Sequence, residues 1–379
     1  MTITNIAGNC APGFKALKSA FENNFNEHDE IGASLCIYQH GEKVVDLWGG
    51  HSDSAKSQPW EKDTLVNVWS TTKGMMALCV ARLVDQGKLE MGRTVAGYWP
   101  EFAANGKEHV TVAQLFSHQA GLCGTDKPIT KSQVLNTDLL GEMLAAQKPQ
   151  WPIGESSGYH AFSIGPIADT LFKKVIGKTV GEYFRDEIAI PFDIDFHIGL
   201  DKSEDDRVAE MAHDDNIPGG DPAMFNEYQK FAIENASLSP YLPNERAWRA
   251  QGTPSAAGCG NARSVAKIYG ALATDRCLDG VEIVSQKALG AATEIQIDKL
   301  DLVLGFPMSW GIGFAMNKSM GIYGPNPNAF GHHGWGGSFG FADPEKGLGV
   351  AYTMNYMREP LDAIDPRLAA IIHAIYSSV

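Results

Sequence analysis

A serine and a lysine lie three residues apart in the segment Trp69-Ser70-Thr71-Thr72-Lys73-Gly74, where an apolar helix is expected to begin. Residues i and i+3 share one face of a helix, so the Lys73 amine can lie beside the Ser70 hydroxyl. A hydroxyl is a weak nucleophile, and a neighbouring base activates it by taking its proton. This S-x-x-K spacing therefore predicts acyl transfer through Ser70, with Lys73 as its base partner.

The same spacing occurs a second time, in Ser264-Val265-Ala266-Lys267, which we interpret as part of an ordinary surface helix. Ser70 has the more favourable setting, because it follows the strand-like residues 65–69 and opens a helix expected to be buried. Backbone N–H groups at a helix N-terminus favour developing negative charge. The alternative for Ser70 is purely structural, since serine also caps helices.

Two further segments have the composition of site loops. Residues 151–161 contain proline and glycine and bring Tyr159 to the start of a predicted helix. Residues 330–344 are rich in glycine beside strand-forming residues, which implies that another backbone or a ligand approaches closely. Both segments are therefore candidates to complete a site around Ser70.

Ser338 is a competing nucleophile, because Gly336-Gly337-Ser338-Phe339-Gly340 fits G-x-S-x-G. That motif acts as a nucleophile elbow when a strand, a sharp turn and then a helix surround it. The residues after Ser338 predict a strand and an Asp343-Pro344 turn instead, and no HGGG-type oxyanion motif precedes them. We therefore favour Ser70.

Apolar periodicity predicts the elements that position these residues. We expect strands and helices at both ends of the chain, with a mostly helical middle. The predicted helices cover residues 12–27, 70–86, 111–116, 162–186 and 366–377, and the predicted strands cover 33–38, 43–48, 310–316, 337–342 and 349–354. Residues 200–250 have weak periodicity and predict a long excursion around the site.

This order of elements predicts an α/β (α+β) fold with one sheet built from both termini and an inserted helical region. The corresponding division is an α/β domain of residues 1–95 and 255–379 and a mostly helical domain of residues 96–254. At 379 residues, the chain is long enough for each domain to bury its own core.

Charge and composition narrow the possible partners. A net charge of −14 argues against nucleic acid or an anionic membrane. Neither a signal peptide nor an apolar run of transmembrane length is found. The six cysteines are scattered without C-x-x-C pairs, and Cys36 and Cys79 are expected to be buried free thiols. A cytoplasmic location fits this pattern best.

The sequence also predicts no cofactor. It contains no H-E-x-x-H metal motif, no Walker A segment and no Rossmann fingerprint. The adjacent His332 and His333 would point to opposite sides of a strand, so they are poorly placed to share a metal.

Taken in order, these segments resemble the serine β-lactamase-like superfamily, and most closely the family VIII carboxylesterases, which are relatives of class C β-lactamases. The resemblance covers nearly the whole chain and includes residues 111–122 (TVAQLFSHQAGL), 254–272 and 330–355. It implies an antiparallel sheet flanked by helices, with a serine nucleophile and no cofactor.

The resemblance also implies a role for each site residue. Ser70 resembles the nucleophile, Lys73 its base partner, and Tyr159 the tyrosine that shares proton transfer with the lysine. His332-His333-Gly334 takes the place of a K-T-G strand, and Trp335-Gly336-Gly337 matches the W-G-G element of such esterases. The backbone N–H groups of Ser70 and Trp335 would form the oxyanion hole. The residues expected to bind substrate are His332, Gly334, Trp335, Gly336, Gly337 and Trp310. Trp310 and Trp335 are expected to line an apolar acyl or alcohol pocket.

Two departures from the penicillin-recognising pattern point to an ester substrate. Ala161 stands where those enzymes carry asparagine, and His332, largely neutral at pH 7, stands where they carry a cationic lysine. The expected function is therefore hydrolysis of short-chain carboxylic esters through an acyl-enzyme on Ser70, with weak cephalosporin hydrolysis as a side activity. The alternatives are a β-lactamase, a D-amino-acid peptidase or amidase on the same scaffold, and a non-catalytic binding protein.

Overall fold

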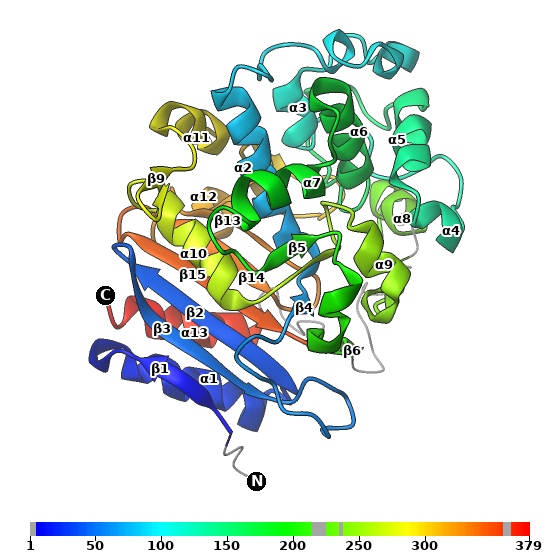
Figure 1. Ribbon diagram of the computed structural model, residues 1–379. Helices are drawn as coiled ribbons and strands as arrows, with labels where there is room; N and C mark the ends of the chain where they lie inside the picture. Colours follow the sequence, from blue (N-terminus) through cyan, green and yellow to red (C-terminus); the bar gives the residue numbers. More distant parts are fainter. Residues whose placement is uncertain (1–4, 214–224, 235–237, 359–364) are drawn as a thin grey trace.

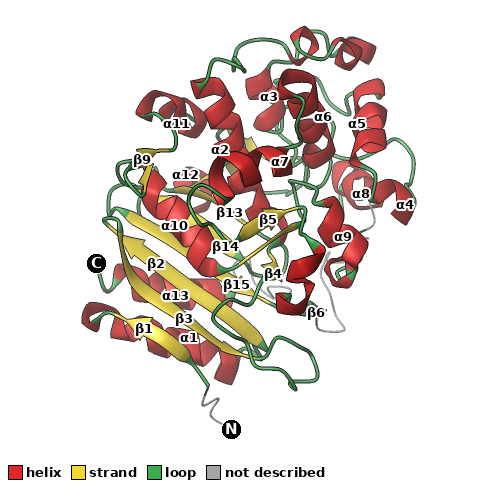
Figure 2. Cartoon of the chain, in the orientation of Figure 1, coloured by secondary structure: helices red, strands yellow, loops and turns green. Residues whose placement is uncertain are grey.

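The computed structural model describes residues 5–213, 225–234, 238–358 and 365–379. Its centre is a nine-stranded sheet in which every neighbouring pair of strands is antiparallel (Figures 1 and 2). In spatial order the strands are β1 (Ala7–Cys10), β3 (Glu42–Gly50), β2 (Gly32–Gln39), β15 (Leu348–Met354), β14 (Phe339–Asp343), β13 (Phe330–His333), β12 (Ala315–Met316), β11 (Pro307–Trp310) and β10 (Ile297–Leu300). The prediction of one sheet built from both ends of the chain is confirmed.

Helices cover both faces of the sheet, which explains why its central strands are almost wholly apolar. On one face, α10 (Ala262–Leu272) packs against β15, β2 and β14. On the other face, α1 (Lys15–Glu27) packs beside α13 (Pro366–Tyr376) (Figure 1). Every residue of β15 is buried, as expected for a strand with helices on both sides.

The predicted helix 70–86 is present as a short 3-10 turn, Trp69–Thr71, followed by α2 (Thr72–Asp85). Residues 72–81 of α2 are all buried. Gly74 lies against the Tyr269 hydroxyl of α10, where a Cβ atom would come within 1.9 Å of that oxygen. This close packing fixes the helix that carries Lys73 at the centre of the molecule.

The remaining helices lie mainly in the middle of the chain. They are α3 (Val112–Phe116), α4 (Lys131–Val134), α5 (Thr137–Ala146), α6 (Ile164–Ile176), α7 (Val180–Phe184), α8 (Glu227–Glu234), α9 (Arg246–Gln251), α11 (Gln286–Thr293) and α12 (Asn317–Met320). The smaller strands are β4 (Val66–Asn67), β5 (Phe196–Ile198), β6 (Ala212–His213), β7 (Gly258–Gly260), β8 (Cys277–Leu278), β9 (Val281–Glu282) and β16 (Tyr356–Met357). The division into domains at residues 95 and 254 stays a prediction.

Three local predictions were wrong or incomplete. The strand expected over 310–316 is two strands, β11 and β12, because the chain turns at Gly313, which has a φ of +75° and packs on Ala77. The helix expected over 162–186 ends at Gly177, whose φ of +73° terminates α6. The helix that carries Ser264 is largely buried on the sheet and is not a surface helix.

The excursion expected over 200–250 contains short elements, among them α8 and α9, and part of it, residues 214–224 and 235–237, lies outside the described residues. Cys36 and Cys79 are buried free thiols, as expected. None of the helices in the described part of the chain has the length and apolar content needed to span a lipid bilayer.

Candidate active site

Ser70 and Lys73 lie together at the start of α2, as their spacing predicts. Lys73 Nζ is 2.9 Å from Ser70 Oγ. Lys73 is completely buried, whereas Ser70 is partly exposed. Trp69, directly before the serine, has a left-handed φ of +47°, a conformation that non-glycine residues adopt only when their surroundings hold them in it. The chain therefore presents a reachable hydroxyl beside a lysine that water does not reach.

The surroundings of Lys73 favour its neutral form. Nζ donates to the carbonyl oxygens of Ala161, at 2.6 Å, and Ser255, at 2.7 Å. No carboxylate pairs with it among the described residues, and burial lowers the pKa of the amine well below its usual value. A neutral amine has two N–H groups and one lone pair. With both N–H groups held by carbonyls, the lone pair is left for the Ser70 hydroxyl.

Tyr159 lies over this pair with its ring enclosed by aromatic groups. Lys73 Nζ is 4.9 Å from the centre of the Tyr159 ring. Trp310 stacks on the ring at 5.4 Å with an interplanar angle of 7°, and His332 stacks at 5.8 Å. Burial raises the pKa of the phenol, which the Ser70 hydroxyl opposes. Apart from Ser70, the buried Tyr159 Oη meets no hydrogen-bond partner in the described structure. Because its pKa is raised, Tyr159 is a neutral phenol with its proton available.

The two histidines of β13 differ in their surroundings. His332 is buried against Tyr159 and Trp310, and its Nε2 has no partner among the described residues. Burial and the nearby Lys73 lower the pKa of His332. His333 Nδ1 lies 3.5 Å from the hydroxyl of Tyr323, and burial lowers the pKa of His333 to about 4. Both imidazoles are therefore neutral at pH 7.

The loop after β13 brings a second backbone N–H group into the same region. Gly336 and Gly337 have φ values of +88° and +126°, which only glycine adopts readily. Trp335 packs edge-on to Trp69 at 4.9 Å. Within the described ranges, the backbone N–H groups of Ser70 and Trp335 donate to no protein acceptor, so both are available to bind an oxyanion.

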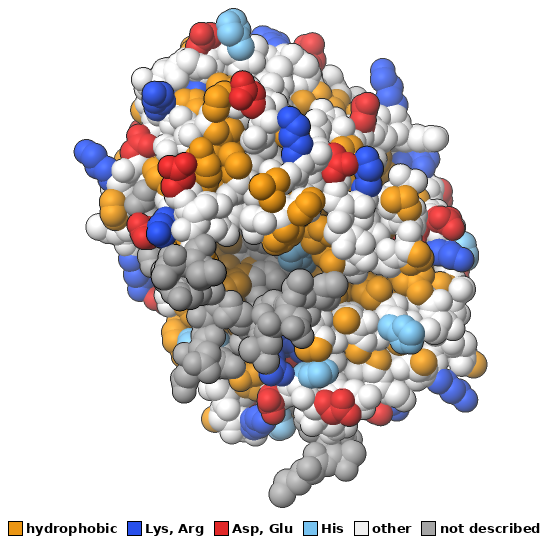
Figure 3. Space-filling view, turned by 180° about the vertical axis from the view of Figure 1, so that it is seen from behind, with side chains coloured by type: hydrophobic (Ala, Val, Ile, Leu, Met, Phe, Trp, Pro, Cys, Tyr) orange, Lys and Arg blue, Asp and Glu red, His pale blue; other side chains and the backbone are white. Residues whose placement is uncertain are grey.

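An apolar cavity of about 550 Å³ adjoins this loop. Its lining residues are Phe306, Pro307, Ser319, Met320, Ile322, His333, Gly334, Trp335, Gly336, Gly337, Ser338, Arg358, Asp365 and Leu368. Hydrophobic side chains also gather across the middle of the face opposite to that of Figure 1 (Figure 3). Trp335 and the three glycines expected to bind substrate line the cavity, whereas Trp310 and His332 pack on Tyr159 and do not.

The two competing serines have structural contacts instead. Ser338 is buried, donates to the carbonyl of Val68 at 2.8 Å and is followed by strand β14, so the context of a nucleophile elbow is absent. Ser264 Oγ accepts a hydrogen bond from the Asp195 N–H, while Lys267 donates to the carbonyl of Phe192. The Ser264 hydroxyl and the Lys267 amine therefore bind different backbone groups and do not form a nucleophile–base pair.

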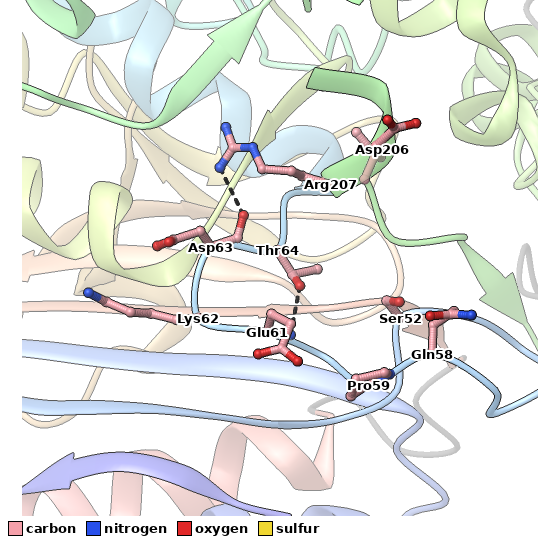
Figure 4. Close-up of a pocket in the computed structure, with 10 residues that line it drawn as sticks. Ser52, Gln58, Pro59, Glu61, Lys62, Asp63, Thr64, Asp206 and Arg207 are labelled. Atoms are coloured by element: carbon pink, nitrogen blue, oxygen red, sulfur yellow. Dashed lines mark hydrogen bonds between the residues drawn. The ribbon is translucent and has the colours of Figure 1, made fainter. Parts of the chain in front are cut away.

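A second cavity, of about 510 Å³, lies between residues 52–64 and 206–208 and is polar (Figure 4). Arg207 donates to the carbonyl of Asp63 at 2.9 Å and forms ion pairs with Asp195 and Glu204. The cavity's arginine is thus held by carboxylates outside the lining. Neither histidine nor cysteine is among the described residues that line the cavity. Elsewhere in the described ranges, no three histidine, cysteine or carboxylate side chains are grouped as metal ligands would be.

Sequence reasoning missed three residues that contact this site. His118, which accepts a hydrogen bond from the His160 N–H, packs edge-on to Tyr159 and Trp310. Asp301 accepts hydrogen bonds from the backbone of Tyr159 and the indole of Trp310. Arg367 of α13 donates to the carbonyl of Gly336 at 2.6 Å. His118 lies within the family-like segment 111–122, but no local pattern marks Asp301 or Arg367.

The antiparallel sheet with helices on both faces, together with a serine and a buried lysine paired at the start of a central helix, defines a protein of the serine β-lactamase-like class. The chain belongs to the beta-lactamase family, whose family model matches residues 17–374.

Its relatives include esterases. A crystal structure of a family VIII carboxylesterase is 44% identical, with a TM-score of 0.93 over 99% of this chain and 100% of that chain. A penicillin-binding protein homologue from Caulobacter crescentus is 40% identical, with a TM-score of 0.92 over the same shares. Esterase/beta-lactamase LipL of Mycobacterium tuberculosis is 34% identical over 95% of this chain and 85% of its own length. The expected relationship to family VIII carboxylesterases is confirmed.

Proposed function

We propose that the protein is a serine carboxylesterase that hydrolyses short-chain esters through an acyl-enzyme on Ser70. The observation that carries the proposal is the contact between Ser70 Oγ and the buried Lys73 amine, which two carbonyls hold and which no anion among the described residues contacts. A base that is neutral near pH 7 is what activation of a serine hydroxyl requires.

The first half of the proposed reaction forms the acyl-enzyme. Ser70 Oγ attacks the ester carbonyl carbon while its proton passes to Lys73. The carbonyl oxygen becomes an oxyanion and is held by the N–H groups of Ser70 and Trp335; one such donor typically contributes about 3–4 kcal/mol to the transition state. The carbon–oxygen bond to the alcohol then breaks, and the alcohol leaves with a proton delivered through Tyr159.

The second half repeats these steps with water. Water attacks the acyl carbon while its proton passes to Lys73, with Tyr159 relaying it by giving its own proton to the amine, and the bond to Ser70 Oγ breaks. The serine regains its proton and the carboxylic acid leaves. The cavity beside Gly334–Gly337 is proposed to hold an apolar part of the ester, because its lining is largely apolar and includes Trp335.

An ester is favoured over a β-lactam because of the charge at the site. His332, in the place of a cationic lysine, is buried and neutral, so it offers no full positive charge to a substrate carboxylate. Ala161 contributes only a backbone carbonyl, which Lys73 occupies. Cephalosporin hydrolysis is therefore proposed as a weak side activity at most, although the related LipL is named both esterase and beta-lactamase.

The proposed domain division places the site where the two parts meet. Ser70, Lys73 and the 332–337 segment come from residues 1–95 and 255–379, and Tyr159 with Ala161 comes from residues 96–254. We also propose a cytoplasmic location, which suits the free cysteines.

Labelling with a serine-directed phosphonate, followed by mass mapping of the peptide, tests the proposal. We expect label on Ser70 and loss of p-nitrophenyl butyrate hydrolysis in Ser70→Ala. Ser264→Ala and Ser338→Ala serve as matched controls and should keep the label. Label on either control serine, or activity in Ser70→Ala, would refute the assignment. Absence of both label and turnover in the wild type would favour a binding protein, and faster turnover of nitrocefin or D-amino-acid amides than of esters would favour the other hydrolases.

A further inference from the structure

Asp301, in the turn between β10 and β11, is fully buried and uses both carboxylate oxygens as acceptors. Oδ1 accepts from the backbone N–H groups of Tyr159 at 2.9 Å, Val303 at 3.1 Å and Leu304 at 3.0 Å. Oδ2 accepts from Trp310 Nε1 at 3.0 Å. In the described structure no lysine or arginine pairs with this carboxylate, so four N–H groups hold its charge.

Two of these four bonds hold Tyr159 in independent ways. The bond from the Tyr159 N–H to Oδ1 anchors the backbone of the tyrosine directly. The bond from Trp310 Nε1 to Oδ2 orients the indole that stacks on the Tyr159 ring at 5.4 Å and almost parallel to it. The N–H of Leu302, the residue after Asp301, adds a bond to the carbonyl of Ser157 at 2.8 Å in the same loop. The turn thus holds both the main chain and one face of the ring.

The phenol needs this support because its hydroxyl faces only the reacting Ser70 hydroxyl. Apart from Ser70, Tyr159 Oη meets no hydrogen-bond partner among the described residues, so the ring position depends mainly on its stacking partners and on the backbone. We propose that Asp301 is a positioning residue for Tyr159, holding the phenol over Ser70 and Lys73 for proton transfer. This inference rests on the proposed function, because it gives Tyr159 a part in the reaction.

The negative charge of Asp301 also supports the proposed role of Tyr159, because it affects the pKa of the phenol. Burial is the main reason why the pKa of Tyr159 is raised, and the negative charge of Asp301 raises it further. A neutral phenol can hand a proton to the departing alcohol, whereas a phenolate cannot. The carboxylate therefore supports both the position and the protonation state of Tyr159.

The central test is a double-mutant cycle of Asp301→Asn and Tyr159→Phe, assayed with p-nitrophenyl butyrate. Asparagine has nearly the same shape, but its amide cannot accept from both the backbone N–H groups and the Trp310 N–H. The resulting misplacement of a catalytic group is expected to lower kcat roughly 10- to 100-fold, with KM changed less than about threefold. Because Asp301 acts through Tyr159, adding Asp301→Asn to Tyr159→Phe should cost less than about threefold more.

Two further measurements separate positioning from general stability. Asp298→Asn removes a carboxylate from the adjacent strand that binds Ser309, Ser319 and Lys318 but not Tyr159, and it should keep wild-type kcat. Urea unfolding of Asp301→Asn gives the folded fraction, and kcat per folded molecule should still be lower than that of the wild type.

The outcomes distinguish the role inferred for Asp301 from the proposed function of the site. Wild-type kcat in Asp301→Asn, or a loss that multiplies fully with that of Tyr159→Phe, would overturn the role of Asp301 and leave the proposed function intact. Wild-type activity in Tyr159→Phe would overturn the proposed part of Tyr159 itself. An equal loss of kcat in Asp298→Asn and Asp301→Asn would show that any disturbance of this hairpin suffices, which also overturns the inference.

Discussion

Replacing Lys73 by methionine and by arginine tests whether its neutral amine is the base. Methionine removes the amine with little change in volume. Arginine keeps a nitrogen donor but stays protonated at any accessible pH. If Lys73 acted only through its positive charge, arginine would preserve activity and methionine would not. If it acts as a base, both variants should lose activity.

The structure sets the size of each loss. A positioned general base contributes roughly 10²- to 10⁴-fold to the rate, so kcat/KM should fall by about that factor in both variants. In the methionine variant the carbonyls of Ala161 and Ser255 also lose their donor. An unsatisfied buried carbonyl costs about 1–3 kcal/mol, so the free energy of unfolding should fall by a few kcal/mol, partly offset by burial of an apolar side chain.

The assay is the pH dependence of kcat/KM for p-nitrophenyl butyrate, corrected for the folded fraction from urea unfolding. Burial lowers the pKa of Lys73, and only the neutral amine accepts a proton. Activity should therefore be full above this lowered pKa and fall as the pH drops through it. Tyr159, His332 and His118 also face the site, so His332→Gln is the control and should keep this acid limb.

Either of two results would refute the reasoning. One is a methionine variant that, per folded molecule, retains activity within tenfold of wild type. The other is an arginine variant with wild-type activity, since a permanently charged guanidinium cannot serve as the base.

Two other predictions concern buried charges. Burial raises the pKa of Asp169 to about 7, against about 3.9 in the unfolded chain, so the folded state binds this proton more tightly and stability is lost as the pH rises between those values. Asp169→Asn should therefore gain unfolding free energy over wild type by about 1–3 kcal/mol more at pH 8 than at pH 5; equal gains at both would contradict this. Arg367→Met leaves Glu30 without its ion pair and the Gly336 carbonyl with only the Arg358 N–H as donor, which should cost about 3–5 kcal/mol and also lower kcat. Glu30→Gln in the same background should restore stability more than kcat, and undiminished stability of Arg367→Met would argue against the buried pair.

Elements defined by their own apolar pattern could be predicted from the sequence. β2, β3, α2 and α13 each contain enough local periodicity to identify their type and approximate ends. β1 and β10 were missed because they are mostly exposed and their strand form depends on pairing with β3 and β11. The break at Gly313 was missed because its cause, contact with Ala77 of α2, is distant in sequence.

The same distinction between local and distant contacts decides which site residues could be predicted from the sequence. The pairing of Ser70 with Lys73 is a property of one helical turn, so spacing alone predicts it. Asp301 lies 142 residues from Tyr159, and nothing in its neighbourhood marks it. Ala161 shows a further limit, since its side chain suggested only a lost interaction whereas its carbonyl binds Lys73. A sequence pattern does not show where backbone oxygens will point.

The pairing of β2 with β15 has a consequence for biosynthesis. The hydroxyls of Ser34 and Thr353 meet across this pair at 2.8 Å, although 319 positions separate them in the chain. At about 5–20 residues per second, a ribosome needs on the order of 15–60 s between completing β2 and completing its partner. During that time the apolar β2–β3 hairpin has an unpaired edge, which is the kind of surface on which chaperones act and aggregates begin. We therefore expect the yield of folded enzyme to depend on translation speed and chaperone supply more than its final stability would suggest.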